Sequence, residues 1–191
     1  MLTQQENKLN RSLSPQHGDS ADFLLRPWKL EDVESLVEHA NNSNIAKFMT
    51  NTFRHPYGKD DAERFIAFAT KDDPIHIFAI EVEGKAVGGI GLHLQEDIMS
   101  KNAELGYWLG EKYWGRGIIT KAVKQMVAFG FKTYDINRVY ARPFGTNTAS
   151  QKVLEKAGFQ LEAKLEKTIF KNGEFLDELI YAVRREMNEV E

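Results

Sequence analysis

The chain has 191 residues, a length typical of one domain, and its 42% apolar and 28% charged residues are ordinary for a globular protein. A net charge of −3 and a pI near 6.0 give no basic footprint of the kind that binds nucleic acid. The absence of cysteine excludes disulfides, cysteine-bound zinc and a thiol nucleophile. It also fits a reducing compartment, and we expect a cytoplasmic protein.

The N-terminal segment differs in composition from the rest of the chain. Residues 1–22 are polar and lack the apolar middle of a signal peptide, and no later apolar run is long enough to span a membrane. We therefore expect a flexible tail over 1–22 and one domain over 23–187, with no membrane partner. An ordered arm against a partner subunit is the alternative for the tail.

The predicted elements, in chain order, are a strand at 23–26, helices at 33–40 and 60–69, strands at 75–82, 85–95 and 102–109, a helix within 115–131, a strand at 137–141, a helix at 147–157 and strands at 159–170 and 175–185. Asp60 is expected to cap the second helix, because Glu63 follows three residues later. Gly158 is expected to end the last helix. This order predicts a mixed sheet flanked by helices, in one α/β domain.

A glycine pair lies between the strand at 102–109 and the helix that follows it. Gly115 and Gly117 let the backbone approach a ligand closely. The first amides of the helix lack intrahelical partners and carry the positive end of the helix dipole, which together favour a pyrophosphate. The segment lacks the Gly-Lys-Ser/Thr ending of a P-loop and the three-glycine spacing of a dinucleotide site. A plain turn is the alternative interpretation.

Three motifs in this order resemble the RimJ/RimL-like branch of the GNAT acetyltransferases, from about Leu24 to Ala182. Residues 103–109 resemble the family's fourth strand, Lys112–Gly117 its pyrophosphate loop, and residues 147–150 with 153–159 its second CoA-binding helix. Lys112 stands where the family has Gln or Arg and keeps the positive charge. The resemblance implies a GNAT-type fold and an N-acetyltransferase that uses acetyl-CoA. The acceptor would be a primary amine, either a peptide N-terminus or a small molecule.

The resemblance also implies a CoA site. Its predicted residues are Trp108, Leu109, Lys112, Tyr113, Trp114, Gly115, Arg116, Gly117, Ile118, Thr120 and Asn147. Amides from about Lys112 to Ile118 would hold the pyrophosphate, and the backbone of Trp108 and Leu109 would pair with the pantetheine arm like an added strand. Asn147 would bind the CoA arm, although it can also cap its helix. Arg116 would contact phosphate or, alternatively, be a solvated charge.

Glu104 is the candidate for proton transfer. It lies in an otherwise apolar strand, on one face with Gly106 and Trp108. An acceptor amine arrives as an ammonium, and a partly buried carboxylate can take its proton directly or through a water. The alternatives are that Glu104 faces solvent, pairs with a lysine, or binds the amine without being the base.

The departing CoA thiolate also needs a hydrogen-bond donor. Many GNAT enzymes place a tyrosine at the position of Leu154, whereas members of this branch often use a serine at the position of Ser150, one helical turn earlier. We expect Ser150 to donate to the sulfur; the alternative is a bond back to a helix carbonyl. Amides of the fourth strand are expected to stabilise the acetyl oxygen. A base at His93 is conceivable, but a surface histidine is more common there, and the histidine spacing predicts no metal site.

Two other functional classes stay open. A CoA-binding sensor without turnover is favoured by Leu154 and disfavoured by Glu104, and a plain interaction domain leaves the glycine loop unexplained. The acceptor site is expected near Asn44–Tyr57, His93 and Arg142–Thr146, whose lack of clustered acidic residues weighs against polyamines. A homodimer is the commonest assembly for such an enzyme.

Overall fold

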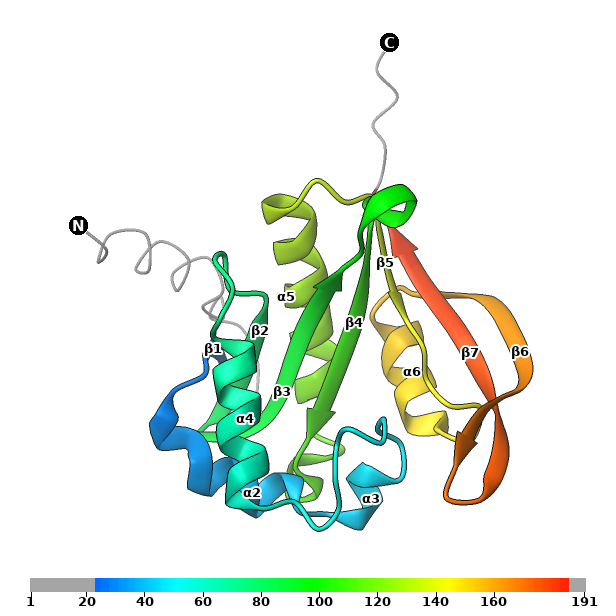
Figure 1. Ribbon diagram of the computed structural model, residues 1–191. Helices are drawn as coiled ribbons and strands as arrows, with labels where there is room; N and C mark the ends of the chain where they lie inside the picture. The colour runs from blue at the N-terminus through cyan, green and yellow to red at the C-terminus, as the bar shows by residue number, and fades with distance from the viewer. Residues whose placement is uncertain (1–22, 186–191) are drawn as a thin grey trace.

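The computed structural model describes residues 23–185, which form one seven-stranded mixed sheet (Figure 1). The strands are β1 (Phe23–Pro27), β2 (Ile77–Val82), β3 (Lys85–Leu94), β4 (Asn102–Leu109), β5 (Arg138–Ala141), β6 (Gln160–Lys171) and β7 (Glu174–Arg184). Their spatial order is β1-β2-β3-β4-β5-β7-β6. All neighbours are antiparallel except β4 and β5, which are parallel.

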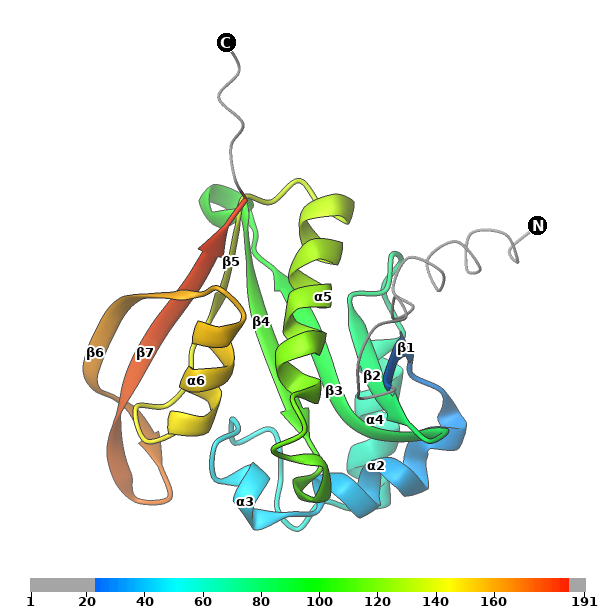
Figure 2. The same ribbon diagram turned by 180° about the vertical axis from the view of Figure 1, so that it is seen from behind.

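Helices cover both faces of the sheet. They are α2 (Val33–Ala40), α3 (Ser43–Ala46), α4 (Lys59–Ala69), α5 (Ile118–Thr133) and α6 (Thr148–Lys156), with short 3₁₀ helices η1 (Leu30–Asp32), η2 (Asp97–Met99) and η3 (Glu111–Tyr113). Helices α2 and α4 lie on the face toward the viewer in Figure 1, and α5 and α6 lie on the opposite face, seen in Figure 2. Within the described residues, no helix is both long and apolar enough to cross a membrane.

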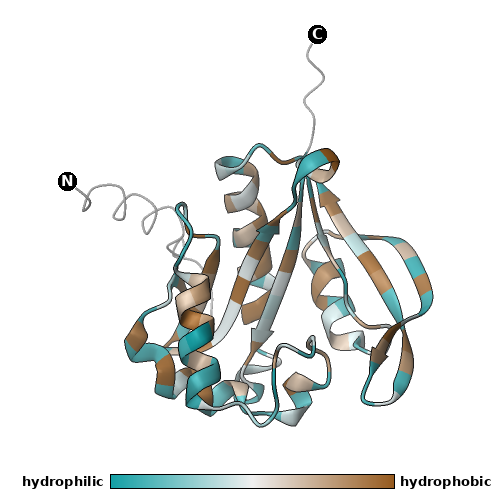
Figure 3. Cartoon of the chain, in the orientation of Figure 1, coloured by the Kyte–Doolittle hydropathy of each residue, from teal (hydrophilic) through white to brown (hydrophobic). Residues whose placement is uncertain are grey.

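Each face of the sheet has its own apolar core, because successive side chains of a strand point to opposite faces. The core under α5 and α6 includes Phe78, Ile90 and Met126, all essentially inaccessible. The core under α2 and α4 is built around Trp28 and Trp108. By contrast, the outer β6–β7 hairpin alternates between hydrophilic and hydrophobic residues along its length (Figure 3).

The predicted mixed sheet and the order of its long elements are confirmed, and β4 begins and ends where it was predicted. The predicted cap of α4 is wrong. The helix begins at Lys59, and its N-cap is Gly58, whose amide donates to the Asp61 carboxylate at 3.0 Å. Asp60 lies in the first turn of the helix and does not cap it. The carboxylate that accepts from the N-cap amide is that of Asp61.

The short elements were missed. The four-residue helix α3 and the three 3₁₀ helices were not predicted, since segments of three or four residues carry no apolar period. The strand predicted to begin at Ile75 begins at Ile77. The tail predicted over 1–22 lies outside the described residues.

A buried ionic cluster joins β1 to the beginning of α2. Arg26 donates two hydrogen bonds of 2.7 Å to Asp32, and its Nε donates to Glu81 on β2. Arg26 and Asp32 are each only 7% exposed. Burial alone would raise the pKa of Asp32, but hydrogen bonds from Arg26 and from the Lys29 amide hold it below its usual range. The pair fixes the chain where it leaves the sheet.

Replacing Asp32 by asparagine should lower the free energy of unfolding by about 3 kcal/mol at neutral pH, because the buried Arg26 charge loses its more buried carboxylate partner and keeps only Glu81. The folded-state pKa of Asp32 lies below the unfolded value, so the stabilisation is complete above that unfolded value and is lost as the pH falls through the folded one. Urea unfolding should show the difference from wild type shrinking below about pH 4. Asp60→Asn, at an exposed position, is the control; an equal loss in both variants would contradict the role of the pair.

Candidate functional site

Strand β4 leaves its parallel neighbour halfway along its length. Its pairing with β5 covers only three residue pairs and ends at Glu104↔Tyr140. From Leu105 to Leu109, β4 pairs with β3 on one side and with no strand of residues 23–185 on the other. The two ribbons accordingly separate toward the lower end of Figure 1. Unpaired backbone groups at this edge are open to an extended ligand.

The glycine turn follows at the end of β4. Gly115 and Gly117 both adopt left-handed backbone conformations, with φ of 77° and 75°. A Cβ at either position would have nothing within 4 Å, so conformation rather than crowding requires glycine here. Gly117 is the N-cap of α5 and provides no capping side chain. The first amides of the 16-residue helix are therefore available to an anion.

Several side chains around the glycine turn are buried, so a ligand would contact mainly backbone groups there. Trp108, Leu109, Tyr113 and Ile118 are each at most 8% exposed. The Trp114 indole donates to the Leu109 carbonyl at 2.7 Å, so this carbonyl already has a partner. Gly115, Arg116 and Gly117 are exposed and Thr120 is half-buried. The predicted contacts through amides thus agree with the way these side chains are buried.

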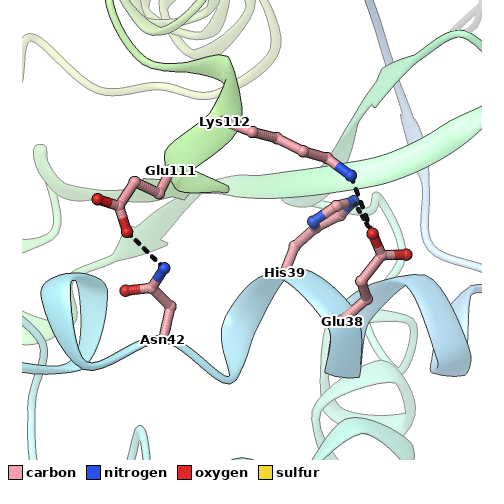
Figure 4. Close-up of a pocket in the computed structure, with 5 residues that line it drawn as sticks. All are labelled: Glu38, His39, Asn42, Glu111 and Lys112. Carbon is pink, nitrogen blue, oxygen red and sulfur yellow. Dashed lines mark hydrogen bonds and ion pairs between the residues drawn. The ribbon is translucent and has the colours of Figure 1, made fainter.

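Lys112 points away from the turn, toward α2. Its ammonium pairs with Glu38 at 2.9 Å, and this contact raises the pKa of Lys112 and lowers that of Glu38. Glu111 accepts hydrogen bonds from Asn42 and Asn44, at 2.7 and 3.1 Å. These contacts tie η3 to α2, to α3 and to the segment between them, and Figure 4 shows those to Glu38 and Asn42. A role for Lys112 at the pyrophosphate therefore rests on its amide.

The same residues line a pocket of about 410 Å³, namely Glu38, His39, Asn42, Glu111 and Lys112. Figure 4 shows η3 on one side and the end of α2 on the other. Burial, and then the charge of Lys112, lowers the pKa of His39, which is 5% exposed and lies edge-on to Tyr113. His39 thus acts as a neutral packing residue beneath the turn.

On the α6 side of β4, two hydroxyls meet. The Tyr107 hydroxyl lies 2.7 Å from Ser150 Oγ, and burial raises the pKa of Tyr107 to about 12. The Asn147 side chain accepts a hydrogen bond from the Ser150 amide at 3.1 Å and so caps α6. Leu154 is completely buried and carries no hydrogen-bond donor. Ser150 is therefore held by a neutral phenol, a contact that sequence reasoning missed.

On the opposite face, Glu104 is half-buried at the point where β4 and β5 separate. The Tyr140 hydroxyl donates to its Oε2 at 3.4 Å, and burial followed by the charge of Glu104 raises the pKa of that phenol. Arg142 Nη1 lies 4.0 Å from the same oxygen, and Arg142 Nε donates to Glu178 at 2.7 Å. Tyr140 pairs with Glu104 in the β4–β5 register and so lies on the same face of the sheet, and Arg142 follows directly after β5.

Sequence reasoning named Glu104 but missed Tyr140 and Glu178, and it placed Arg142 only in an acceptor loop. The sequence signal for Tyr140 was its place in the alternating side-chain pattern of a short strand. That pattern puts Tyr140 beside Glu104 only once the β4–β5 register is known. His93 faces Glu104 across the β3–β4 ladder, and its ring lies edge-on to His76. Within residues 23–185, no group of three His, Asp or Glu residues could hold a metal ion.

A family model described as the GNAT acetyltransferase domain matches residues 22–160. The chain belongs to the GNAT acetyltransferase family. It is an acetyl-CoA-dependent N-acetyltransferase, and the predicted family, fold and enzyme class are confirmed. The N-acetyltransferase p20 of Bacillus licheniformis is 28% identical over 84% of this chain and 92% of that protein. The spermidine N(1)-acetyltransferase of Escherichia coli K12 is 26% identical over 79% of this chain and 80% of that protein.

Solved GNAT structures share the whole fold. The microcin C7 self-immunity acetyltransferase MccE, in complex with acetyl-CoA and AMP, has a TM-score of 0.77 and 26% identity, covering 92% of this chain and 99% of that one. The ribosomal L7/L12 acetyltransferase RimL, in complex with coenzyme A, has a TM-score of 0.76 and 20% identity, covering 87% and 95%. At 20% identity, the likeness to RimL shows that the two proteins share the fold.

The geometry of this acetyltransferase fits acetyl-CoA. Two left-handed glycines and the uncapped start of α5 suit a pyrophosphate, and the free edge of β4 suits an extended pantetheine arm. We expect the pyrophosphate at the amides around Gly117 and the arm along Leu105–Leu109. Ser150 lies on the α6 side of this edge.

Gly117→Ala should weaken CoA binding about tenfold, which corresponds to about 1.4 kcal/mol. An alanine at φ 75° costs about 1–2 kcal/mol, and a loop that relaxes to avoid this strain moves its amides. Isothermal titration calorimetry with CoA measures the effect. Gly84→Ala is the matched control, because Gly84 has φ of 77°, equally open surroundings and a place in the distant β2–β3 turn. It should lose the same stability but bind CoA like wild type. Unchanged CoA affinity in Gly117→Ala would contradict pyrophosphate binding at the glycine turn.

Proposed function

We propose that the enzyme transfers acetyl directly to a primary amine within a ternary complex, with Glu104 receiving the proton. The position of Glu104 carries the proposal. Its carboxylate is half-buried, lies where β4 separates from β5 and is held by Tyr140 and Arg142. The chain has no cysteine to form an acyl-enzyme.

Bound acetyl-CoA would supply the acetyl thioester along the free edge of β4, and the residues of this chain would do the rest. The Glu104 carboxylate would bind the acceptor ammonium and take its proton, directly or through a water, leaving a neutral amine. The nitrogen then forms a bond to the acetyl carbon while the carbon–sulfur bond breaks, and the nitrogen loses its second proton as the thiolate takes one up, so that the products are the N-acetyl amine and the CoA thiol. Unpaired amides of β4 would stabilise the charge on the acetyl oxygen.

Ser150 would donate a hydrogen bond to the departing CoA thiolate. The Tyr107 phenol, kept protonated by burial, can donate to Ser150 Oγ and leave the serine proton free to point toward the thiolate. In this arrangement Ser150 is the catalytic donor and Tyr107 is a positioning residue. The buried Leu154 carries no donor, and the pair takes over the task of the tyrosine found there in many relatives.

The acceptor, the location and the assembly are part of the proposal. Names of similar proteins include a spermidine and a ribosomal-protein acetyltransferase, which supports a small amine or a peptide N-terminus as acceptor. The cysteine-free composition supports a cytoplasmic enzyme. A homodimer is proposed on the general frequency of such assemblies.

Glu104→Gln should reduce kcat/KM at least a hundredfold with any accepted amine, because the amide cannot take a proton. The acetyl-CoA affinity should stay within twofold, since Glu104 lies on the face opposite Ser150. CoA-release kinetics with a panel of amines and N-terminal peptides, combined with calorimetry, separate the two effects. Initial rates in both substrates should give the intersecting lines of a ternary complex. Equal rates in mutant and wild type would remove Glu104 from the chemistry, and CoA binding without turnover on any amine would favour a sensor.

Tyr107→Phe and Ser150→Ala should each lower kcat about tenfold to a hundredfold, and the double variant should be no slower than Ser150→Ala alone. The reason is that the phenol acts only through the serine hydroxyl. Fixed-time assays of kcat at saturating acetyl-CoA, on wild type, both single variants and the double variant, complete this double-mutant cycle. Tyr134→Phe is the control, because that phenol is also partly buried but its hydroxyl bonds the Ile75 carbonyl away from α6. Additive losses would show that Tyr107 does not work through Ser150.

A further inference from the structure

Arg142 presents free hydrogen-bond donors beside Glu104. It follows β5 directly, and its side chain is 46% exposed. Its Nε is taken by Glu178, whereas its Nη1 lies 4.0 Å from Glu104, beyond hydrogen-bond distance. Its Nη2 has no partner among residues 23–185. The outer edge of the guanidinium is therefore available to a ligand.

Glu178 is the group that anchors Arg142. Its side chain is 8% exposed, compared with 34% for Glu104. A buried carboxylate needs a cation, so the Arg142–Glu178 contact satisfies the buried charge and leaves Glu104 as an accessible carboxylate. The result is one accessible anion and one accessible guanidinium edge about 4 Å apart.

We propose that Glu104 and Arg142 together recognise a free α-amino acid, with the ammonium on Glu104 and the carboxylate on the Nη1–Nη2 edge of Arg142. This inference rests on the proposed function and names its acceptor class. The short Glu104–Arg142 distance suits an amine and a carboxylate separated by a single carbon. A guanidinium binds a carboxylate through two parallel, charge-assisted hydrogen bonds, which a lysine or a neutral donor cannot reproduce.

The same geometry disfavours two other acceptor classes. A polyamine would place a second cation near Arg142, and like charges at this distance repel. A peptide N-terminus offers a neutral carbonyl in place of the carboxylate, and this carbonyl would gain a weaker hydrogen bond from the guanidinium. Both classes are therefore comparison substrates for the test.

The experiment compares acceptors that differ only at the carboxylate. A screen of the twenty amino acids selects the best acceptor, which is then compared with its carboxamide and with the amine that lacks the carboxyl group. Wild type should prefer the acid over both analogues by at least about tenfold in kcat/KM. In Arg142→Gln this preference should disappear through a raised KM for the acid.

Two further variants distinguish a loss of carboxylate recognition from a loss of folding. Arg142→Gln combined with Glu178→Gln removes the charge that would otherwise be buried alone, and it should show the same loss of preference. Arg184→Gln is the matched control, because Arg184 is an exposed arginine that also pairs with a glutamate, Glu162, at the outer part of the sheet. It should keep the preference for the acid. Thermal unfolding of each variant verifies folding.

The outcomes separate this inference from the proposed function. Turnover with no preference for the acid, or a preference that persists in both Arg142 variants, overturns the inference and leaves acetyl transfer intact. Absence of CoA release with every amine overturns the proposed function. In that case calorimetric binding of the twenty amino acids to the CoA-loaded protein decides the inference. Binding that Arg142→Gln abolishes supports it, and binding that the variant retains, or no binding at all, overturns it.

Discussion

The organisation of this acetyltransferase depends on the early end of the hydrogen bonding between β4 and β5. After Glu104↔Tyr140 the two parallel strands no longer pair, although both continue in the same sheet. Unpaired amides and carbonyls within a sheet are stable only when water or a ligand satisfies them. An extended substrate arm can do so, and the residues on both sides of the opening are positioned by the same separation.

The alternation of β4 then divides the chemistry between two faces. Tyr107 points toward α6 and meets Ser150, whereas Glu104 points to the other face and meets Tyr140 and Arg142. In the proposed mechanism, the acceptor and the leaving group are therefore bound on opposite sides of one strand. A carboxylate and a neutral phenol can be close along the chain without sharing an environment, because the sheet itself lies between them.

Much of this arrangement could be predicted from the sequence. The apolar periods predicted the long elements, and the glycine pair before an amphipathic helix predicted the turn that begins α5, because both signals are local. The contacts that complete the site are not local. Tyr140 and Glu104 are separated by 36 residues, as are Arg142 and Glu178. Only the register of β4, β5 and β7 brings them together, and no spacing in a single sequence encodes that register.

The two apolar cores have a consequence for how such enzymes diversify. Helices α5 and α6 pack on one core, and the segment from α2 to α4 packs on the other, with the sheet between them. Mutations on one side can therefore accumulate with little effect on packing on the other. Contacts that connect the two sides at the surface include Lys112–Glu38 and Glu111–Asn42. A lineage can thus reshape the walls that select an acceptor while inheriting the donor-binding half unchanged.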